Sequence, residues 1–199
     1  MLADDGALGV VLSSRSGRAR DLAVDVGWSA MVQVSACDVS DTSDACALIA
    51  CTAPTGVLHA AGVLRDRMVR SLTRSDVEAV LAPKALAASH VQSLVMRTPL
   101  EAFGLFSSMS STFGSVGQGN YAAANAWLDT VAKTRQHHGA VGSSLQIGAV
   151  RGFGMGAATF AEDQLDAMGA LSLDEFARFL SIALASARSG TARVLTPLP

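Results

Sequence analysis

Short apolar runs alternate with longer mixed segments along most of the chain. The apolar runs predict buried strands at residues 8–13, 31–36, 57–62, 102–108 and 143–149, with a last short strand at 192–196. The segments between them predict helices at 20–26, 41–51 and 73–95, and from near Asn120 to Gly139. Pro83 is expected to bend the third of these helices. This alternation indicates an α/β fold with a doubly wound parallel sheet, in which ligands bind at the carboxyl ends of the strands.

A further helix is predicted near the C-terminus. Ser172 and Glu175 have the spacing of a capping box, and Leu171 and Phe176 have that of a hydrophobic staple. Apolar residues then recur at helical spacing until Gly190 ends the pattern. We expect this helix to pack its apolar face on the core.

Composition and charge narrow the class of protein. The 199 residues, 50% hydrophobic and 16% charged, suit a single folded domain over 1–199. A net charge of −2 provides no basic field for nucleic acid. The apolar run 45–64 is broken by Pro54-Thr55-Gly56, so no membrane span is predicted. The three cysteines have neither metal-site nor disulfide spacing, which predicts no metal centre and favours a reducing, cytoplasmic location.

Candidate chemistry is concentrated in residues 103–132. An apolar strand ends at Ser107 and Ser108, a glycine-broken loop follows, and an alanine-rich helix carries Tyr121 and Asn125 on one face. A hydroxyl and a phenol at one place can polarise a carbonyl oxygen, and the phenol can supply the proton that the oxygen needs after hydride addition. Because an unperturbed tyrosine titrates at about 10, a nearby cation or strong donor is expected.

The chain has two lysines, Lys84 and Lys133, that could supply the cation near the tyrosine. Lys84 lies in an otherwise apolar stretch, where a charge is unfavourable unless something uses it, and Lys133 lies late on the Tyr121 helix. Each residue alone has a purely structural interpretation, with Ser108 as a strand-end cap, Tyr121 as a packing ring and Lys84 as a snorkelling side chain. Together they favour a functional site.

Ser108, Tyr121, Asn125 and Lys84 together resemble the ketoreductase domain of modular polyketide synthases, a branch of the short-chain dehydrogenase/reductase superfamily. Simpler members of that superfamily carry Tyr-x-x-x-Lys, whereas the synthase domains carry Tyr-x-x-x-Asn and place the lysine on the preceding helix, as this chain does. The resemblance runs from about Asp4 to the C-terminus.

This resemblance implies a reaction in polyketide or fatty acid synthesis. A β-ketoacyl thioester on an acyl carrier protein is reduced to the β-hydroxyacyl thioester with NADPH. Tyr121 donates the proton, Ser108 holds the carbonyl oxygen, and Lys84 with Asn125 sets the acidity of the tyrosine and the proton relay.

The resemblance also implies a cofactor site. Ser14 and Arg15 lie where an arginine pairs with a 2′-phosphate, which favours NADPH over NADH, although an exposed arginine on a turn is about as often only solvated. Asp38 and Val39 resemble the residues that bind the adenine, and a turn or capping role for Asp38 stays equally open. Ala60-Ala61-Gly62 resembles the small-residue segment against which the cofactor lies, while His59 is interpreted as a core histidine.

Two loops resemble substrate-binding segments of the family. Leu64-Arg65-Asp66 matches the Leu-x-Asp pattern of B-type members, and Phe113 stands where the opposite class tends to carry tryptophan. Val116 departs from this pattern, since B-type members usually have proline there. Gly154 and Met155 lie in a glycine-rich loop that corresponds to the one beside the nicotinamide and substrate, where it can act as a lid hinge.

The family begins with a strand that ends in Thr-Gly-Gly-x-Gly-x-x-Gly and holds the pyrophosphate, and this chain has no such stretch. We therefore expect a domain that lacks the first strand and its glycine-rich loop and is incomplete at its N-terminus. That strand lies mid-sheet in the family, between those near Val11 and Leu58.

Three outcomes are then open for the sheet: these two strands pair directly, another chain or synthase domain supplies the strand, or the sequence is a fragment.

The alternative function is a non-catalytic remnant that acts as a scaffold or interaction module without tight cofactor binding.

Overall fold

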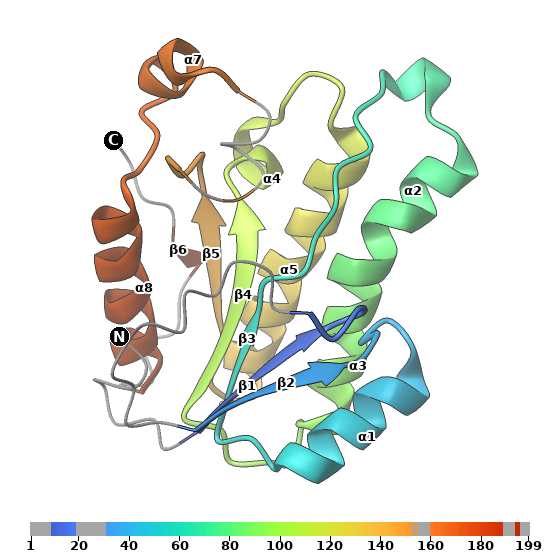
Figure 1. Cartoon of the computed structure of the whole chain (residues 1–199), viewed down its shortest axis with the longest axis vertical. Helices are drawn as coiled ribbons and strands as arrows, with labels where there is room; N and C mark the ends of the chain where they lie inside the picture. The colour runs from blue at the N-terminus through green and yellow to red at the C-terminus, as the bar shows by residue number, and fades with distance from the viewer. Residues whose placement is uncertain (1–8, 19–30, 153, 155–159, 189–193, 196–199) are drawn as a thin grey trace.

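The computed structural model describes residues 9–18, 31–152, 154, 160–188 and 194–195. Within them, parallel strands form two sheets (Figure 1). One sheet pairs β1 (Gly9–Ser14) with β2 (Met31–Ala36). The other has the order β3 (Gly56–His59), β4 (Ala102–Ser108), β5 (Ser143–Ile147) and β6 (Val194–Leu195). The predicted α/β fold with parallel strands is confirmed.

Helices connect the strands, and those predicted at 41–51, 73–95, from near Asn120 and near the C-terminus are confirmed. They are α1 (Thr42–Thr52), the short η1 (Val69–Ser71), α2 (Arg74–Leu81), α3 (Ala87–Leu94), α4 (Ser110–Phe113), α5 (Gly119–His137), α7 (Glu162–Ala167) and α8 (Leu173–Arg188). The helix predicted at 20–26 and the helix stop at Gly190 lie outside the described residues. No helix in the described ranges is both long and apolar enough to cross a membrane.

The core lies on both faces of β4 and β5. Phe103, Leu105 and Leu145 are completely buried, with α5 packed on one side and α8 on the other (Figure 1). The capping box predicted for α8 is present, because the backbone N–H of Ser172 donates to Glu175 and that of Glu175 donates to the Ser172 hydroxyl. The central strands are therefore held rigidly between two helices.

The long helical segment around Pro83 is interrupted by a π-helical turn, η2 (Ala82–Leu86), which joins α2 to α3. Proline has no backbone N–H, so it cannot complete the regular α-helical hydrogen bonds. The wider turn places Lys84 on the inner side of the segment, where only 2% of the residue is exposed.

The sheet is divided between β1 and β3. In the part of the chain that the structure describes, β1 pairs only with β2 and β3 pairs only with β4. The direct pairing of these two strands, one of the three outcomes considered from the sequence, is therefore wrong. In Figure 1 the arrows of β1 and β2 point across the view, whereas those of β4 and β5 point upward.

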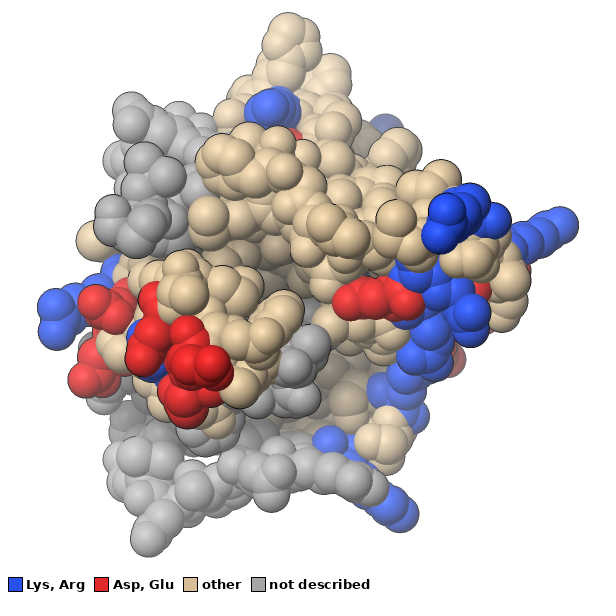
Figure 2. Space-filling model, turned by 90° about the horizontal axis from the view of Figure 1, so that it is seen from above, with Lys and Arg blue, Asp and Glu red and all other residues tan. Residues whose placement is uncertain are grey.

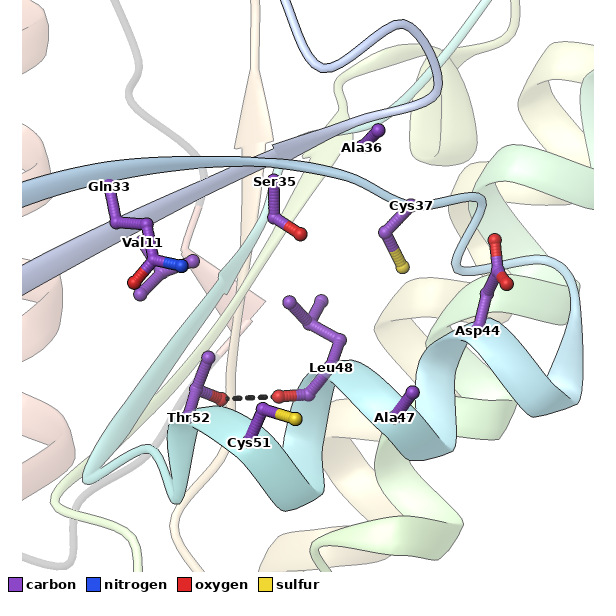
Figure 3. A pocket seen from close by; sticks show the side chains of 10 residues that line it. All are labelled: Val11, Gln33, Ser35, Ala36, Cys37, Asp44, Ala47, Leu48, Cys51 and Thr52. Carbon is purple, nitrogen blue, oxygen red and sulfur yellow. Dashed lines mark hydrogen bonds between the residues drawn. The ribbon is translucent and has the colours of Figure 1, made fainter.

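A cavity of about 170 Å³ separates the β1–β2 sheet from α1 (Figure 3). Val11, Ser35 and Cys37 line it from the strands, and Leu48 and Cys51 line it from the helix. All three cysteines are free thiols, and burial raises the pKa of Cys37. The β1–β2 sheet therefore packs less closely on its helix than β4 and β5 pack on theirs.

Candidate active site at the end of strand β4

The N-terminus of α5 is fixed by a buried asparagine. The Asn120 side-chain amide donates to the backbone oxygens of Arg65 and Asp76, at 3.0 and 3.3 Å. Its Oδ1 atom accepts from the backbone N–H of Tyr121 at 2.9 Å. These bonds hold the first turn of α5 against α2 and the loop after β3, and so fix the position of Tyr121.

Tyr121, Ser108 and Asn125 come together where β4 ends. Tyr121 is 9% exposed, and the side chains of Asn125 and Ser108 lie close enough to its phenol to lower its pKa. The Ser108 hydroxyl also accepts from the backbone N–H of Ser110 at 3.2 Å, which holds it at the start of α4. The spacing of residues 121 and 125 on one helical face therefore places them as the sequence predicts.

Lys84 reaches this group from the π-helical turn. Its Nζ donates to the backbone oxygen of Phe106 at 2.8 Å and lies 5.3 Å from the centroid of the Tyr121 ring. Burial lowers the pKa of Lys84 to about 8, and the charge of Asp129 acts in the opposite direction. The structure thus brings all four predicted catalytic residues together.

The phenol of Tyr121 is held in its protonated form. Burial raises its pKa above the ordinary value, hydrogen bonds to Asn125 and Ser108 lower it in part, and the charge of Asp66 raises it. The phenol is therefore protonated at neutral pH, but burial makes it a weaker acid than an ordinary tyrosine, contrary to the expectation that its neighbours make it more acidic.

The side chain of Asn125 has a hydrogen-bond acceptor that no described residue uses. Its Nδ2 donates to the backbone oxygen of Tyr121 at 2.8 Å, and its own backbone oxygen accepts from Ser107 at 3.2 Å. Its Oδ1 atom is buried with no hydrogen-bond partner among the described residues. Since buried polar atoms are nearly always satisfied, this oxygen is available to a water molecule or a ligand.

Asp66 lies at the edge of the site. Gln118, the residue before α5, donates from Nε2 to Asp66 Oδ2 at 2.8 Å. Gly154 is exposed with a φ of +78°, a conformation that favours glycine, and Met155 lies outside the described residues. Of the predicted substrate-binding residues, only Asp66 is shown close to the tyrosine.

Comparisons with known proteins agree on a family. The family model described as "KR domain" matches residues 1–152. The polyketide synthase GfsA of Streptomyces halstedii is 46% identical over 153 residues, which are 72% of this chain and 2% of the relative. The mycoketide-CoA synthase of Mycobacterium tuberculosis is 39% identical over 190 residues, 90% of this chain and 4% of the relative. The chain belongs to the ketoreductase (KR) domain family of modular polyketide synthases.

Solved KR domains share the fold. The first ketoreductase of the tylosin synthase overlays with a TM-score of 0.81 at 34% identity, covering 96% of this chain and 43% of that one. A structure of A-type ketoreductases from a modular polyketide synthase also reaches 0.81, at 32% identity. The chain therefore spans less than half of these solved chains and only a few per cent of the two synthases.

The predicted adenosine-binding residues of this KR domain lie at the end of β1 and just after β1 and β2. Arg15 is exposed on the turn after Ser14, and the Ser14 hydroxyl donates to the backbone oxygen of Arg18 at 3.5 Å. Asp38 Oδ1 accepts from the N–H and the hydroxyl of Ser40, at 3.0 and 2.6 Å. These bonds, and then the charge of Arg15, lower the pKa of Asp38.

Asp38 therefore stabilises a turn, which is one of the two roles that the sequence left open for it. Its carboxylate also lies near Arg15. Val39 is partly buried against the main hydrophobic core.

The small-residue segment follows β3 directly. Ala60 is exposed, and Ala61 and Gly62 are half-buried. His59 before them is 6% exposed, as expected of a core histidine, and burial lowers its pKa to about 4. The strand ends at His59, three residues earlier than the hydrophobic pattern predicts.

Asp129 is the residue that sequence reasoning missed. It lies four residues after Asn125 on the same face of α5, is 7% exposed, and acts on Lys84. The regular spacing of Tyr121, Asn125 and Asp129 was the available signal.

The raised pKa of Tyr121 can be measured directly, because this is the only tyrosine in the chain. We expect phenolate absorbance to appear only above about pH 10. Ser108→Ala removes a hydrogen bond that lowers the pKa, so its midpoint should be higher still, whereas Ser115→Ala, on an exposed loop, should match the wild type. A wild-type midpoint below 10 would contradict the described environment.

Proposed function

We propose that this KR domain performs the NADPH-dependent reduction of a β-ketoacyl thioester, carried by an acyl carrier protein, to the β-hydroxyacyl thioester. The observation that supports this most strongly is the buried grouping of the Tyr121 phenol with Ser108, Asn125 and Lys84. Ketone reduction needs a donor for the carbonyl oxygen, a proton source and a route by which the proton is replaced. This grouping offers all three.

In the proposed reaction the ketone oxygen lies between the hydroxyls of Ser108 and Tyr121. Ser108 donates a hydrogen bond that polarises the carbonyl. A nicotinamide cofactor, when bound, supplies the hydride to the carbonyl carbon. Tyr121 gives its proton to the oxygen as the negative charge develops. The ammonium of Lys84 stabilises the tyrosinate, and a proton returns through a water held by the free Oδ1 of Asn125.

The described residues fit the nicotinamide part of the cofactor better than its adenosine part. Beside the tyrosine, the unpaired Asn125 Oδ1 offers an acceptor, and the small residues 60–62 after β3 would leave room for close approach of a ring. In the adenosine part, Arg15 would pair with the 2′-phosphate and Asp38 with the adenine amino group, beside Val39. Ser14 would complete this part of the site.

We propose that a strand from a further segment or from another synthase domain completes the sheet between β1 and β3. Both strands have one unpaired edge in the described structure, and unpaired strand edges readily accept an added strand. Such a strand would align the two sheets and bring the adenosine-binding residues toward the catalytic group.

The surface around the site suits an acyl substrate. Figure 2 shows the end of the molecule where β4 and β5 finish. Acidic side chains gather over α7, whose first turn contains Glu162 and Asp163, and basic side chains gather on the side of α2. Between them, the described surface is mostly uncharged, as expected for a region that contacts an acyl chain.

The divided sheet is the observation that favours the alternative function, a non-catalytic KR remnant that serves as a scaffold or interaction module. Without a strand between β1 and β3, the adenosine-binding turns lie on a sheet separate from the one that carries Ser108. Cofactor binding by the 199-residue chain distinguishes the two functions.

Titration with NADPH tests the first function. We expect saturable changes in NADPH fluorescence and a raised Tm, because a ligand that binds only the folded state stabilises it. Arg15→Gln should weaken NADPH binding about tenfold by loss of charge-assisted hydrogen bonds and leave NADH binding nearly unchanged. Arg18→Gln, on the same exposed turn, is the matched control. A folded chain whose fluorescence and Tm do not respond to millimolar NADPH would favour the scaffold function.

Replacement of the proton donor tests the mechanism. In the chain that binds NADPH, Tyr121→Phe should lower turnover of a β-ketoacyl thioester at least about 100-fold, with little change in the Kd for NADPH. Lys133→Arg, an exposed substitution on the same helix, should change neither quantity. Retained turnover in Tyr121→Phe would remove this residue from its proposed role.

A further inference from the structure

Asp129 is a buried carboxylate two helical turns after Tyr121. Its Oδ1 accepts from the Ser144 hydroxyl at 2.5 Å, and its Oδ2 accepts from Gln146 Nε2 at 2.8 Å. The Ser111 hydroxyl lies 2.7 Å from the same Oδ2. These three partners are uncharged and lie on β5 and α4, so they solvate the carboxylate without neutralising it.

The first connection from Asp129 leads to Lys84. Burial disfavours the ammonium of Lys84, and the charge of Asp129 is what favours it. The other titratable groups facing Lys84 are His59 from β3 and Tyr121 from α5. The charged and titratable groups of α2 and α3 are engaged elsewhere, in the pairs Arg67–Asp76, Arg74–Glu78 and Thr42–His90. Lys84 and Asp129 form no ion pair within the described residues, so the carboxylate favours the ammonium through its charge at longer range.

The second connection leads to Ser108. The Ser111 hydroxyl that contacts Asp129 also lies 2.8 Å from the backbone oxygen of Ser108. Gln146 Nε2 donates to that same hydroxyl at 3.0 Å, while its Oε1 accepts from Thr112 at 3.0 Å. Asp129 is thus joined to the turn between β4 and α4 that holds the Ser108 hydroxyl in place.

We propose that Asp129 is a positioning residue for the site, acting through Lys84 by its charge and through Ser108 by the Ser111–Gln146 network. This proposal rests on the proposed function only in giving Lys84 and Ser108 their catalytic roles. A carboxylate that merely anchored α5 to β5 would need its hydrogen bonds and not its charge. The electrostatic coupling to Lys84 therefore distinguishes a positioning role from a purely structural one.

NMR of the lysine side chains measures this coupling without cofactor or substrate. The chain has two lysines, so lysine labelled with ¹³C at Cε gives two signals, which Lys133→Arg assigns. We expect Lys84 to titrate at about pH 8 in the wild type. In Asp129→Asn the midpoint should move to lower pH, because the counter-charge is lost while the shape of the side chain is kept.

Ser144→Ala is the matched control, because it removes one hydrogen bond to Asp129 but leaves the charge. Its Lys84 midpoint should stay near that of the wild type. A Lys84 midpoint in Asp129→Asn that equals the wild-type value would overturn the proposal, as would an equal displacement in Ser144→Ala and Asp129→Asn.

A second variant covers the case in which Asp129→Asn does not fold. Asp129→Ser also removes the charge and keeps a hydroxyl toward Ser144, so it too should move the Lys84 midpoint to lower pH. An unchanged Lys84 midpoint in Asp129→Ser would also overturn the proposal.

Turnover separates this proposal from the proposed function. If the wild type reduces the thioester, the pH profile of turnover should be displaced to lower pH in Asp129→Asn and not in Ser144→Ala. A profile that stays in place despite an altered Lys84 midpoint would remove Asp129 from the site. Coupling in a chain that shows no turnover would instead support the electrostatic link and contradict the reductase function.

Discussion

The structure depends on keeping one ammonium group inside the protein. Lys84 is 2% exposed, and burial of a charge is unfavourable unless the charge is solvated by the protein. Three features provide that solvation: the backbone oxygen of Phe106, the face of the Tyr121 ring and the charge of Asp129. Each comes from an element fixed by other contacts, so the π-helical turn, β4 and α5 have to adopt one mutual arrangement for the lysine to be tolerated.

That arrangement gives a site whose chemical properties follow from its packing. The same burial that lowers the pKa of Lys84 raises that of Tyr121, so the two pKa values move apart while both groups stay protonated near neutral pH. The β1–β2 sheet takes no part in this grouping. In this member of the KR family, the described residues bring Ser108, Tyr121, Asn125 and Lys84 together, whereas the turns proposed to bind adenosine lie on a separate sheet.

Local pattern was enough to predict most of the elements. The ranges of β2 and β4 follow directly from apolar runs, and Asp41 and Ser172 mark helix starts by capping chemistry that depends on a few neighbouring residues. Tyr121 and Asn125 follow from helical spacing. The depth of Lys84 did not follow, because it depends on how a proline-induced π turn packs on β4. The Asp129 network joins α4, α5 and β5, and local pattern does not show how these elements pack together.

The most direct test of this account is the pH dependence of stability in the wild type and Lys84→Met. A lysine that titrates at about 8 when folded and at about 10.4 when unfolded binds more protons in the unfolded state between those values. The free energy of unfolding of the wild type should therefore rise relative to Lys84→Met from pH 8 to pH 10, by about 2 kcal/mol. A difference that stays constant over this range would show that the ammonium is as well hydrated in the folded protein as in the unfolded chain, and the account would be wrong.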